Sequence, residues 1–177
     1  MLHTALSALS AALIGCTPAP EKPDPAASAK RYQQAEQALK ARRLDTAAQI
    51  LEELLASDTL HYAAALTLGE IYLRQKHYAQ ALPPLERAQR LKPDRLETRL
   101  ELAQTLSKLG RQTEARALFE SLVGAFPGNA TACMAYADLL MTQDQPDAKG
   151  ALDQYEAILA IDPRHYRARS GKAASLL

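Results

Sequence analysis

The chain has 177 residues, a formal net charge of +1, and an apolar share of 47% that is mostly alanine and leucine. Aromatic residues make up only 5%, and there is no tryptophan. This composition favours short helices that pack closely through small side chains over a β-sheet. The balanced charge excludes a whole-molecule attraction to nucleic acid or to an anionic membrane, so any electrostatic function has to be local.

The first segment, residues 2–15, is apolar or small and contains no lysine, arginine, aspartate or glutamate. A membrane span needs roughly 20 apolar residues, so this shorter stretch fits the apolar region of a signal peptide better. It ends in Leu13-Ile14-Gly15-Cys16, which resembles the bacterial lipobox. The resemblance implies a lipoprotein-type signal peptide at 1–15, cleavage before Cys16, and acylation of Cys16. The protein would then be membrane-anchored and face the periplasm, with Thr17 favouring the outer membrane. The alternative is an uncleaved apolar helix on a cytoplasmic protein.

A proline-rich segment follows the cysteine, with Pro18, Pro20, Pro23 and Pro25 close together. Proline has no backbone N–H and disfavours helix in the residue before it. We therefore expect residues 16–28 to form an extended tether between the anchor and a globular part at 29–177.

Beyond this tether the sequence repeats itself every 34 residues. Two series of small residues recur at this spacing, and a bulky residue follows the second series four positions later. The members are Ala35, Gly69, Ala103 and Ala137; Ala47, Ala81 and Ala115; and Leu51, Leu85 and Phe119, with Tyr155 continuing after Ala151. The last step is 36 residues, and the two extra residues fall in the turn-forming run at 143–147. Self-similarity at this period indicates stacked helical hairpins.

The residues that carry the period resemble the tetratricopeptide repeat. Leu68-Gly69 and Tyr72 match its first helix, and Ala81, Leu85, Ala88 and Pro93 match its second helix and terminating proline. The resemblance implies an all-α fold, a right-handed α-α superhelix of about four helix-hairpin repeats. The repeats are expected at 28–61, 62–95, 96–129 and 130–165, with a terminal helix at 166–177. The resemblance further implies a non-catalytic scaffold for protein–protein interaction.

Family geometry places one face of each first helix on the concave side of the superhelix, where a peptide is expected to bind. The residues on that face are Tyr32, Glu36, Leu39, Leu66, Glu70, Leu73, Leu100, Glu101, Gln104, Met134, Asp138 and Met141. They form an apolar stripe beside a polar row in which Glu36, Glu70 and Asp138 are acidic. These acids either keep the groove soluble or select a basic or amphipathic partner. The family's clamp for C-terminal carboxylates needs cations at positions that are acidic here, which argues against an acidic tail in this groove.

The sequence does not indicate catalysis. Two cysteines cannot build a zinc site, the histidines are isolated turn residues, and there is no glycine-rich phosphate loop. Cys133 falls at a helix-packing position, which predicts a buried, inert thiol. We expect no enzyme activity, cofactor, metal, small-molecule substrate or nucleic-acid partner.

Three features leave alternatives open. Basic clusters at 87–99 and 164–172 either complement helix dipoles or meet an anionic partner or lipid surface. The apolar end at 173–177 either docks on the last repeat or is open to another protein. Small lipoproteins of this build support assembly of pilus, secretion or outer-membrane complexes, which is the implied setting; the alternative is a cytoplasmic co-chaperone or regulator.

Overall fold

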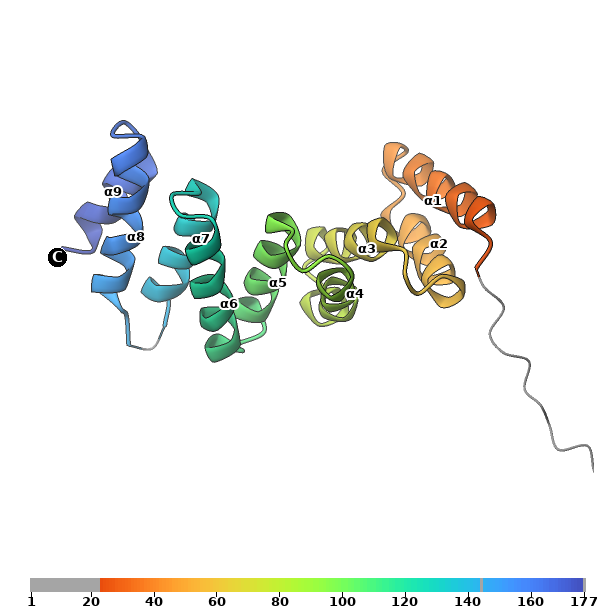
Figure 1. Cartoon of the computed structure of the whole chain (residues 1–177), viewed down its shortest axis with the longest axis horizontal. Coiled ribbons are helices and arrows are strands. Elements are labelled where there is room, and N and C mark those ends of the chain that lie inside the picture. Colours follow the sequence, from red (N-terminus) through yellow and green to blue (C-terminus); the bar gives the residue numbers. More distant parts are fainter. Residues whose placement is uncertain (1–22, 144, 177) are drawn as a thin grey trace, which may run out of the picture.

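The computed structural model describes residues 23–143 and 145–176, which contain nine α-helices and no strand. They are α1 (Pro25–Lys40), α2 (Leu44–Ser57), α3 (Tyr62–Arg74), α4 (Tyr78–Leu91), α5 (Leu96–Lys108), α6 (Gln112–Ala125), α7 (Ala130–Met141), α8 (Ala148–Ile161) and α9 (Tyr166–Ala174). We call the odd-numbered helices first helices and the even-numbered ones second helices. Figure 1 shows the hairpins following one another along the long axis, with α1 and α9 at opposite ends. The predicted all-α stack of helix hairpins is confirmed.

The helices pack against their neighbours in chain order. Each helix contacts the next one in sequence, and the first helices α3, α5 and α7 also contact one another in turn. Helices that touch their counterparts in adjacent hairpins lie on the inner side of a curved stack. The inner wall of this molecule is therefore built from first helices. None of the helices in the described ranges is both long enough and apolar enough to cross a bilayer.

Small residues allow the hairpins to approach closely. Ala47, Ala81, Ala115 and Ala151 are completely buried, and the bulky residues four positions later on the same helices are buried as well. A Cβ added to Gly69 would lie 2.5 Å from Cδ2 of Leu85, so glycine is what lets α3 and α4 meet at this point. The 34-residue period of the sequence is thus a period of helix–helix contacts.

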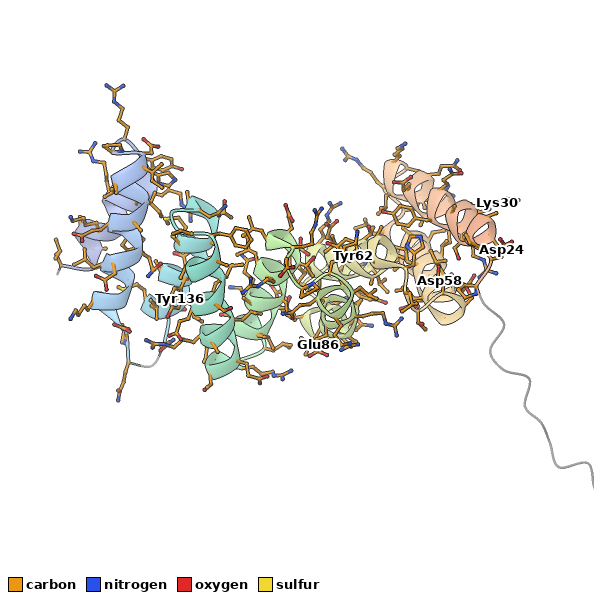
Figure 2. The ribbon with its side chains drawn as sticks, in the orientation of Figure 1. Asp24, Lys30, Asp58, Tyr62, Glu86 and Tyr136 are labelled. Atoms are coloured by element: carbon orange, nitrogen blue, oxygen red, sulfur yellow. The ribbon has the colours of Figure 1, made fainter. Side chains whose placement is uncertain are left out.

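Tyrosine hydroxyls join neighbouring repeats across the stack. Four tyrosines on first helices share hydrogen bonds with the adjacent repeat, two of them with threonine and two with glutamate (Tyr62 and Tyr136 are labelled in Figure 2). The pairs are Tyr32 with Thr67 at 3.2 Å, Tyr62 with Thr98 at 2.8 Å, Tyr136 with Glu120 at 3.0 Å, and Tyr72 with Glu52. Burial and the glutamate partner raise the pKa of both Tyr72 and Tyr136 to about 12, so both hydroxyls stay protonated donors.

The start of the first helix corrects the predicted tether. Residues 25–28 are helical and Ser28 is buried, although the proline count predicted an extended chain up to residue 28. Proline is tolerated at the first helical position because the N–H it lacks has no intrahelical partner there. Pro25 occupies such a position, and the Asp24 side chain accepts a hydrogen bond from the Ala26 N–H at 3.0 Å. The signal peptide, Cys16 and the tether up to residue 22 lie outside the described residues.

The terminal helix is also shorter than expected, because α9 ends at Ala174 and not at residue 177. Ser175 caps the helix through its backbone N–H, and its hydroxyl donates to the Gly171 carbonyl at 2.9 Å. A side chain that competes for the backbone in this way favours a helix end over a helix interior.

Two histidines act as helix caps. Nδ1 of His61 accepts a hydrogen bond from the Ala64 N–H at 3.1 Å, and Nδ1 of His165 accepts one from the Ala168 N–H at 3.2 Å. Both histidines are turn residues, as predicted, but each satisfies an N–H that the first turn of a helix leaves without a partner. His77 begins α4 in the same position and makes no such bond.

The two histidine positions give a matched test of capping. We expect His61→Ala to lower the free energy of unfolding by about 1 kcal/mol, because it leaves an N–H of α3 without a partner. His77→Ala removes no capping bond and should cost clearly less. Urea unfolding followed by circular dichroism measures both, with His61→Asn as the variant expected to restore stability. Equal losses for His61→Ala and His77→Ala would contradict the capping role.

Candidate functional site

The inner wall is hollowed between α3, α5 and α7. A cavity of about 400 Å³ opens there, lined by Leu73, Tyr78, Gln104, Ser107, Lys108, Phe119, Ala135, Asp138, Leu139 and Thr142. A smaller hollow of about 300 Å³ adjoins it toward α9, lined by Gln104, Ala130, Thr131, Met134, Ala135, Asp138, His165 and Arg167. Gln104 and Asp138 line both, so the two hollows form one continuous surface, which we call the inner groove. It combines apolar floor residues with polar side chains at its border, as ligand pockets do.

The structure brings together some of the predicted binding residues. Leu73, Gln104, Met134 and Asp138 line the groove. Met134 is only 8% exposed, so it contributes more to the hydrophobic core than to a free surface. The remaining predicted residues lie on the first helices outside the two hollows: Tyr32, Glu36, Leu39, Leu66, Glu70, Leu100, Glu101 and Met141. The Tyr32 hydroxyl shares a hydrogen bond with Thr67, and the Tyr32 ring centroid lies 5.1 Å from that of His61. Tyr32 therefore contributes to the contact between the first two repeats.

Sequence reasoning missed several groove residues. Tyr78, Lys108, Leu139 and Thr142 belong to the ends of helices that meet at the hairpin turns. The concave-face prediction followed one face of each first helix, so it left out Lys108 and Leu139 on those helices and the residues beyond them. A recurring cation in the last turn of the first helices, present at Lys40, Arg74 and Lys108, was the available signal.

Three carboxylates gather on the inner wall where α3 and α5 meet. Burial, together with the nearby charges of Glu70 and Glu97, raises the pKa of Glu101 to about 7, and Arg74 partly opposes this. Oε2 of Glu101 is buried without a hydrogen-bond partner in the described residues. A partly buried carboxylate whose charge is not fully neutralised lowers the free energy of unfolding. A cation brought by a ligand would relieve this cost.

The acid at the other end of the groove has a weak partner. Oδ2 of Asp138 lies 3.8 Å from the Arg167 guanidinium, and both side chains are more than half exposed. An ion pair this long and this exposed contributes little to stability, so Asp138 can exchange Arg167 for another cation without much loss. Acids are therefore available within the groove, at Asp138, and on the inner wall where α3 and α5 meet, at Glu101.

The described residues do not arrange groups for catalysis. Cys133 is 1% exposed, and burial raises the pKa of its thiol, which makes it a poor nucleophile. No group of three histidine, cysteine or acidic side chains within the described ranges is placed to hold a metal ion.

The raised pKa of Glu101 predicts a stability that falls as pH rises. The folded state holds the proton more tightly than the unfolded state, whose glutamate titrates near 4.5, so stability is lost between about pH 4.5 and 7. We expect Glu101→Gln to be roughly 1–2 kcal/mol more stable than the parent at pH 8, after allowance for solvent screening. The difference should disappear below pH 4.5. Urea unfolding across this range measures it, and a difference that is constant with pH would contradict the assignment.

Two family matches cover most of the helical part of the chain. Residues 40–122 match the family described as anaphase-promoting complex, cyclosome, subunit 3, and residues 100–166 match a tetratricopeptide repeat family. No curated protein sequence matches the chain. Tetratricopeptide repeats are protein-interaction scaffolds and are typically non-enzymatic.

Several solved structures have the same fold. A crystal structure of MamA protein is similar with a TM-score of 0.77 and 16% identity, covering 84% of this chain and 80% of that one. YrrB, described as a TPR protein with an unusual peptide-binding site, has a TM-score of 0.70 and 20% identity over 82% and 74% of the two chains. A tetratricopeptide repeat protein from Parabacteroides merdae has a TM-score of 0.77 and 20% identity over 85% and 59%. The helix hairpins, the family matches and these solved structures together support a tetratricopeptide repeat fold for this chain.

Proposed function

We propose that this protein is a membrane-anchored scaffold that holds a basic or amphipathic segment of another protein in its inner groove. The observation that carries the proposal is the pairing of an apolar hollow with carboxylates that lack sufficient cations, Glu101 above all. The proposed anchor is the acylated Cys16 of a lipoprotein, and the proposed place is the periplasmic side of an envelope membrane, the outer membrane in the first instance.

The groove supports a ligand with two kinds of side chain. Leu73, Phe119 and Leu139 line a cavity of about 400 Å³, which has room for a large apolar side chain of the partner. The acids at Glu70, Glu101 and Asp138 then favour lysine or arginine on either side of that anchor. Apolar contacts supply most of the affinity in such interfaces, and complementary charge selects the partner.

The N-terminal sequence supports the anchored arrangement. Eight residues separate Cys16 from Pro25, where α1 begins, and an extended chain spans about 3.3 Å per residue. The repeats would therefore stay within about 30 Å of the membrane surface. A scaffold held at that distance suits the assembly of an envelope complex such as a pilus, a secretion machine or an outer-membrane complex.

The charge of the groove gives the main functional prediction. We expect the double variant Glu70→Lys with Asp138→Lys to weaken binding of a basic amphipathic peptide at least tenfold. Lysine at both sites replaces attraction with repulsion. Titration of a fluorescent peptide of alternating Leu and Lys, followed by anisotropy, measures the loss.

A matched charge reversal on second helices controls for net charge. Glu53→Lys with Asp153→Lys changes the net charge equally at exposed sites of α2 and α8, away from the groove. We expect this control to bind within about threefold of the parent. Circular dichroism should show unchanged helicity in both variants. Equal peptide binding by the parent and the groove variant would reject the proposed ligand.

The proposed anchor is tested at Cys16. Mass spectrometry of the protein from its producing cell should show an N-terminal, acylated Cys16, and Cys16→Ser should move the protein from the membrane fraction to the soluble fraction. Recovery of an internal, unmodified Cys16 would reject the lipoprotein assignment and favour a cytoplasmic protein, without bearing on the groove.

A further inference from the structure

A second surface, which meets the inner groove at Lys108, carries a local excess of positive charge. The turns that join the two helices of the first three repeats, with the helix ends beside them, contain seven cations against the two carboxylates Asp45 and Glu114. The cations are Lys40, Arg42, Arg43, Arg74, Lys76, Lys108 and Arg111. All seven are exposed. We call this surface the basic edge.

The three turns lie side by side. Nε2 of Gln75, in the second turn, donates to Oδ1 of Asp45 beside the first turn at 2.7 Å. Lys108, next to the third turn, lines the same cavity as Leu73 and Tyr78, which flank the second turn. The cations of three repeats therefore form a continuous strip along one edge of the stack.

Local stability explains only part of this charge. Lys40, Arg74 and Lys108 occupy the last turns of α1, α3 and α5, where a cation complements the helix dipole. Arg43 and Arg111 lie at the opposite end of a helix. They are the N-cap residues of α2 and α6, and their side chains make no capping hydrogen bond. A cation is unfavourable at the positive end of a helix, where serine, aspartate or asparagine is preferred.

The fourth repeat shows what folding alone favours at this site. There the second helix begins with Asp147, whose Oδ1 accepts a hydrogen bond from the Gly150 N–H at 2.8 Å. Asp147 also bonds Arg116 of the preceding repeat at 2.9 Å. The same chain thus uses an acid in the fourth repeat where it has Arg43 and Arg111 in the first and third.

The backbone of the turns supports the same conclusion. Arg42 and Lys76 have φ values of 58° and 60°, in the left-handed region that favours glycine, and the equivalent residue of the third turn is Gly110 with φ 77°. Cations are thus present where the backbone favours glycine and where the helix favours an acid. Folding does not account for Arg42, Arg43 and Lys76 at these positions, whereas Arg111 pairs with Glu114.

The predicted basic clusters elsewhere are used differently. Arg87 donates to the Leu55 carbonyl at 3.3 Å, Arg99 donates to the Ser121 hydroxyl at 2.7 Å, and Lys92 lies 4.4 Å from the centroid of the Tyr62 ring. Arg87 thus joins the first two repeats, whereas Lys92 and Arg99 each contact the other helix of their own repeat. On the basic edge, Arg111 is the one cation that forms an ion pair among the described residues, with Glu114 at 2.6 Å.

We propose that the basic edge of repeats one to three binds an acidic, extended segment of a second protein. A lipid surface is disfavoured because peripheral membrane binding uses exposed apolar side chains beside the cations. The large ones among the described residues are Leu60, Ile161 and Tyr166 in the turns between repeats, at the opposite edge, and Leu176 beyond α9. Single-stranded nucleic acid is disfavoured because it stacks on a series of aromatic rings, and His77 and the adjacent Tyr78 are both beside the second turn, with no ring in the first or third turn.

This proposal is independent of the inner groove, and together the two surfaces describe a scaffold with two binding sites of opposite charge. Carboxylates of the bound segment would pair with the guanidinium groups of Arg42 and Arg43, which suit bidentate contacts. The strip ends at the fourth turn, where Asp147 would repel an acidic chain.

The test uses a variant that should be at least as stable as the parent but should bind the acidic peptide more weakly. In the full chain, R42G/R43D/K76G places glycine at the two left-handed positions and an aspartate cap on α2. The probe is a fluorescent peptide of alternating Glu and Gly, about 12 residues long, which spans roughly 40 Å when extended. We expect the parent to bind it with an affinity that falls as salt rises. The variant should bind at least tenfold more weakly while unfolding at an equal or higher urea concentration.

The matched control is R90A/R95D/R164A, with the same change in net charge. Its residues are exposed cations at the other edge, and Arg95 is likewise an N-cap without a side-chain bond. This control, and the groove variant E70K/D138K, should bind the acidic peptide within about threefold of the parent. Vesicles containing phosphatidylglycerol and an oligothymidine strand should bind more weakly than the peptide.

Three results would overturn the proposal. They are absence of peptide binding by the parent at low salt, an equal loss of binding in the edge variant and its control, or tighter binding of vesicles or oligothymidine than of the peptide.

Discussion

The structure depends on how closely one helix can approach the next. Alanine and glycine at fixed places on each hairpin remove the side chains that would hold the helices apart, and a single bulky residue fills the space that remains. At Gly69 an added Cβ would lie 2.5 Å from Cδ2 of Leu85, so the leucine would have to shift, whereas the equivalent site of the other repeats holds a buried alanine. Because each hairpin can bury its apolar face only against its neighbours, the same contact repeated along the chain produces an elongated stack with an inner wall. The groove and the basic edge both follow from this stacking.

The sequence predicted the fold well because the fold repeats. A 34-residue period in small and bulky residues can be recognised without knowing any single contact, and the two-residue insertion fell in a turn, where it is tolerated. Predictions from single residues were less reliable. Pro25 suggested an extended chain but begins a helix, and Pro83 and Pro84 would ordinarily break a helix yet lie inside α4. Pro25 is tolerated because it occupies the first helical position, where the N–H it lacks has no intrahelical partner.

The site was harder to predict than the fold, for a physical reason. Which face of a helix points inward follows from the period, so Leu73, Gln104 and Asp138 could be placed on the groove in advance. How far each side chain is covered depends on its neighbours in space, which the period does not give. Met134 was expected to be a free anchor and is nearly buried, whereas Lys108 and Thr142, which were not among the predicted residues, line the groove.

The arrangement of charge carries more information than its sum. A net charge of +1 rules out long-range attraction of the whole molecule, but acids gather where α3 and α5 meet on the inner wall and cations gather on the turns of the first three repeats. Each accumulation works against folding: Glu101 is half-buried beside other carboxylates, and Arg43 caps a helix start that favours an acid. Stability alone would remove both features by substituting glutamine for Glu101 and aspartate for Arg43. Their presence on separate surfaces of a repeat scaffold is what a protein needs to hold two partners of opposite charge at once.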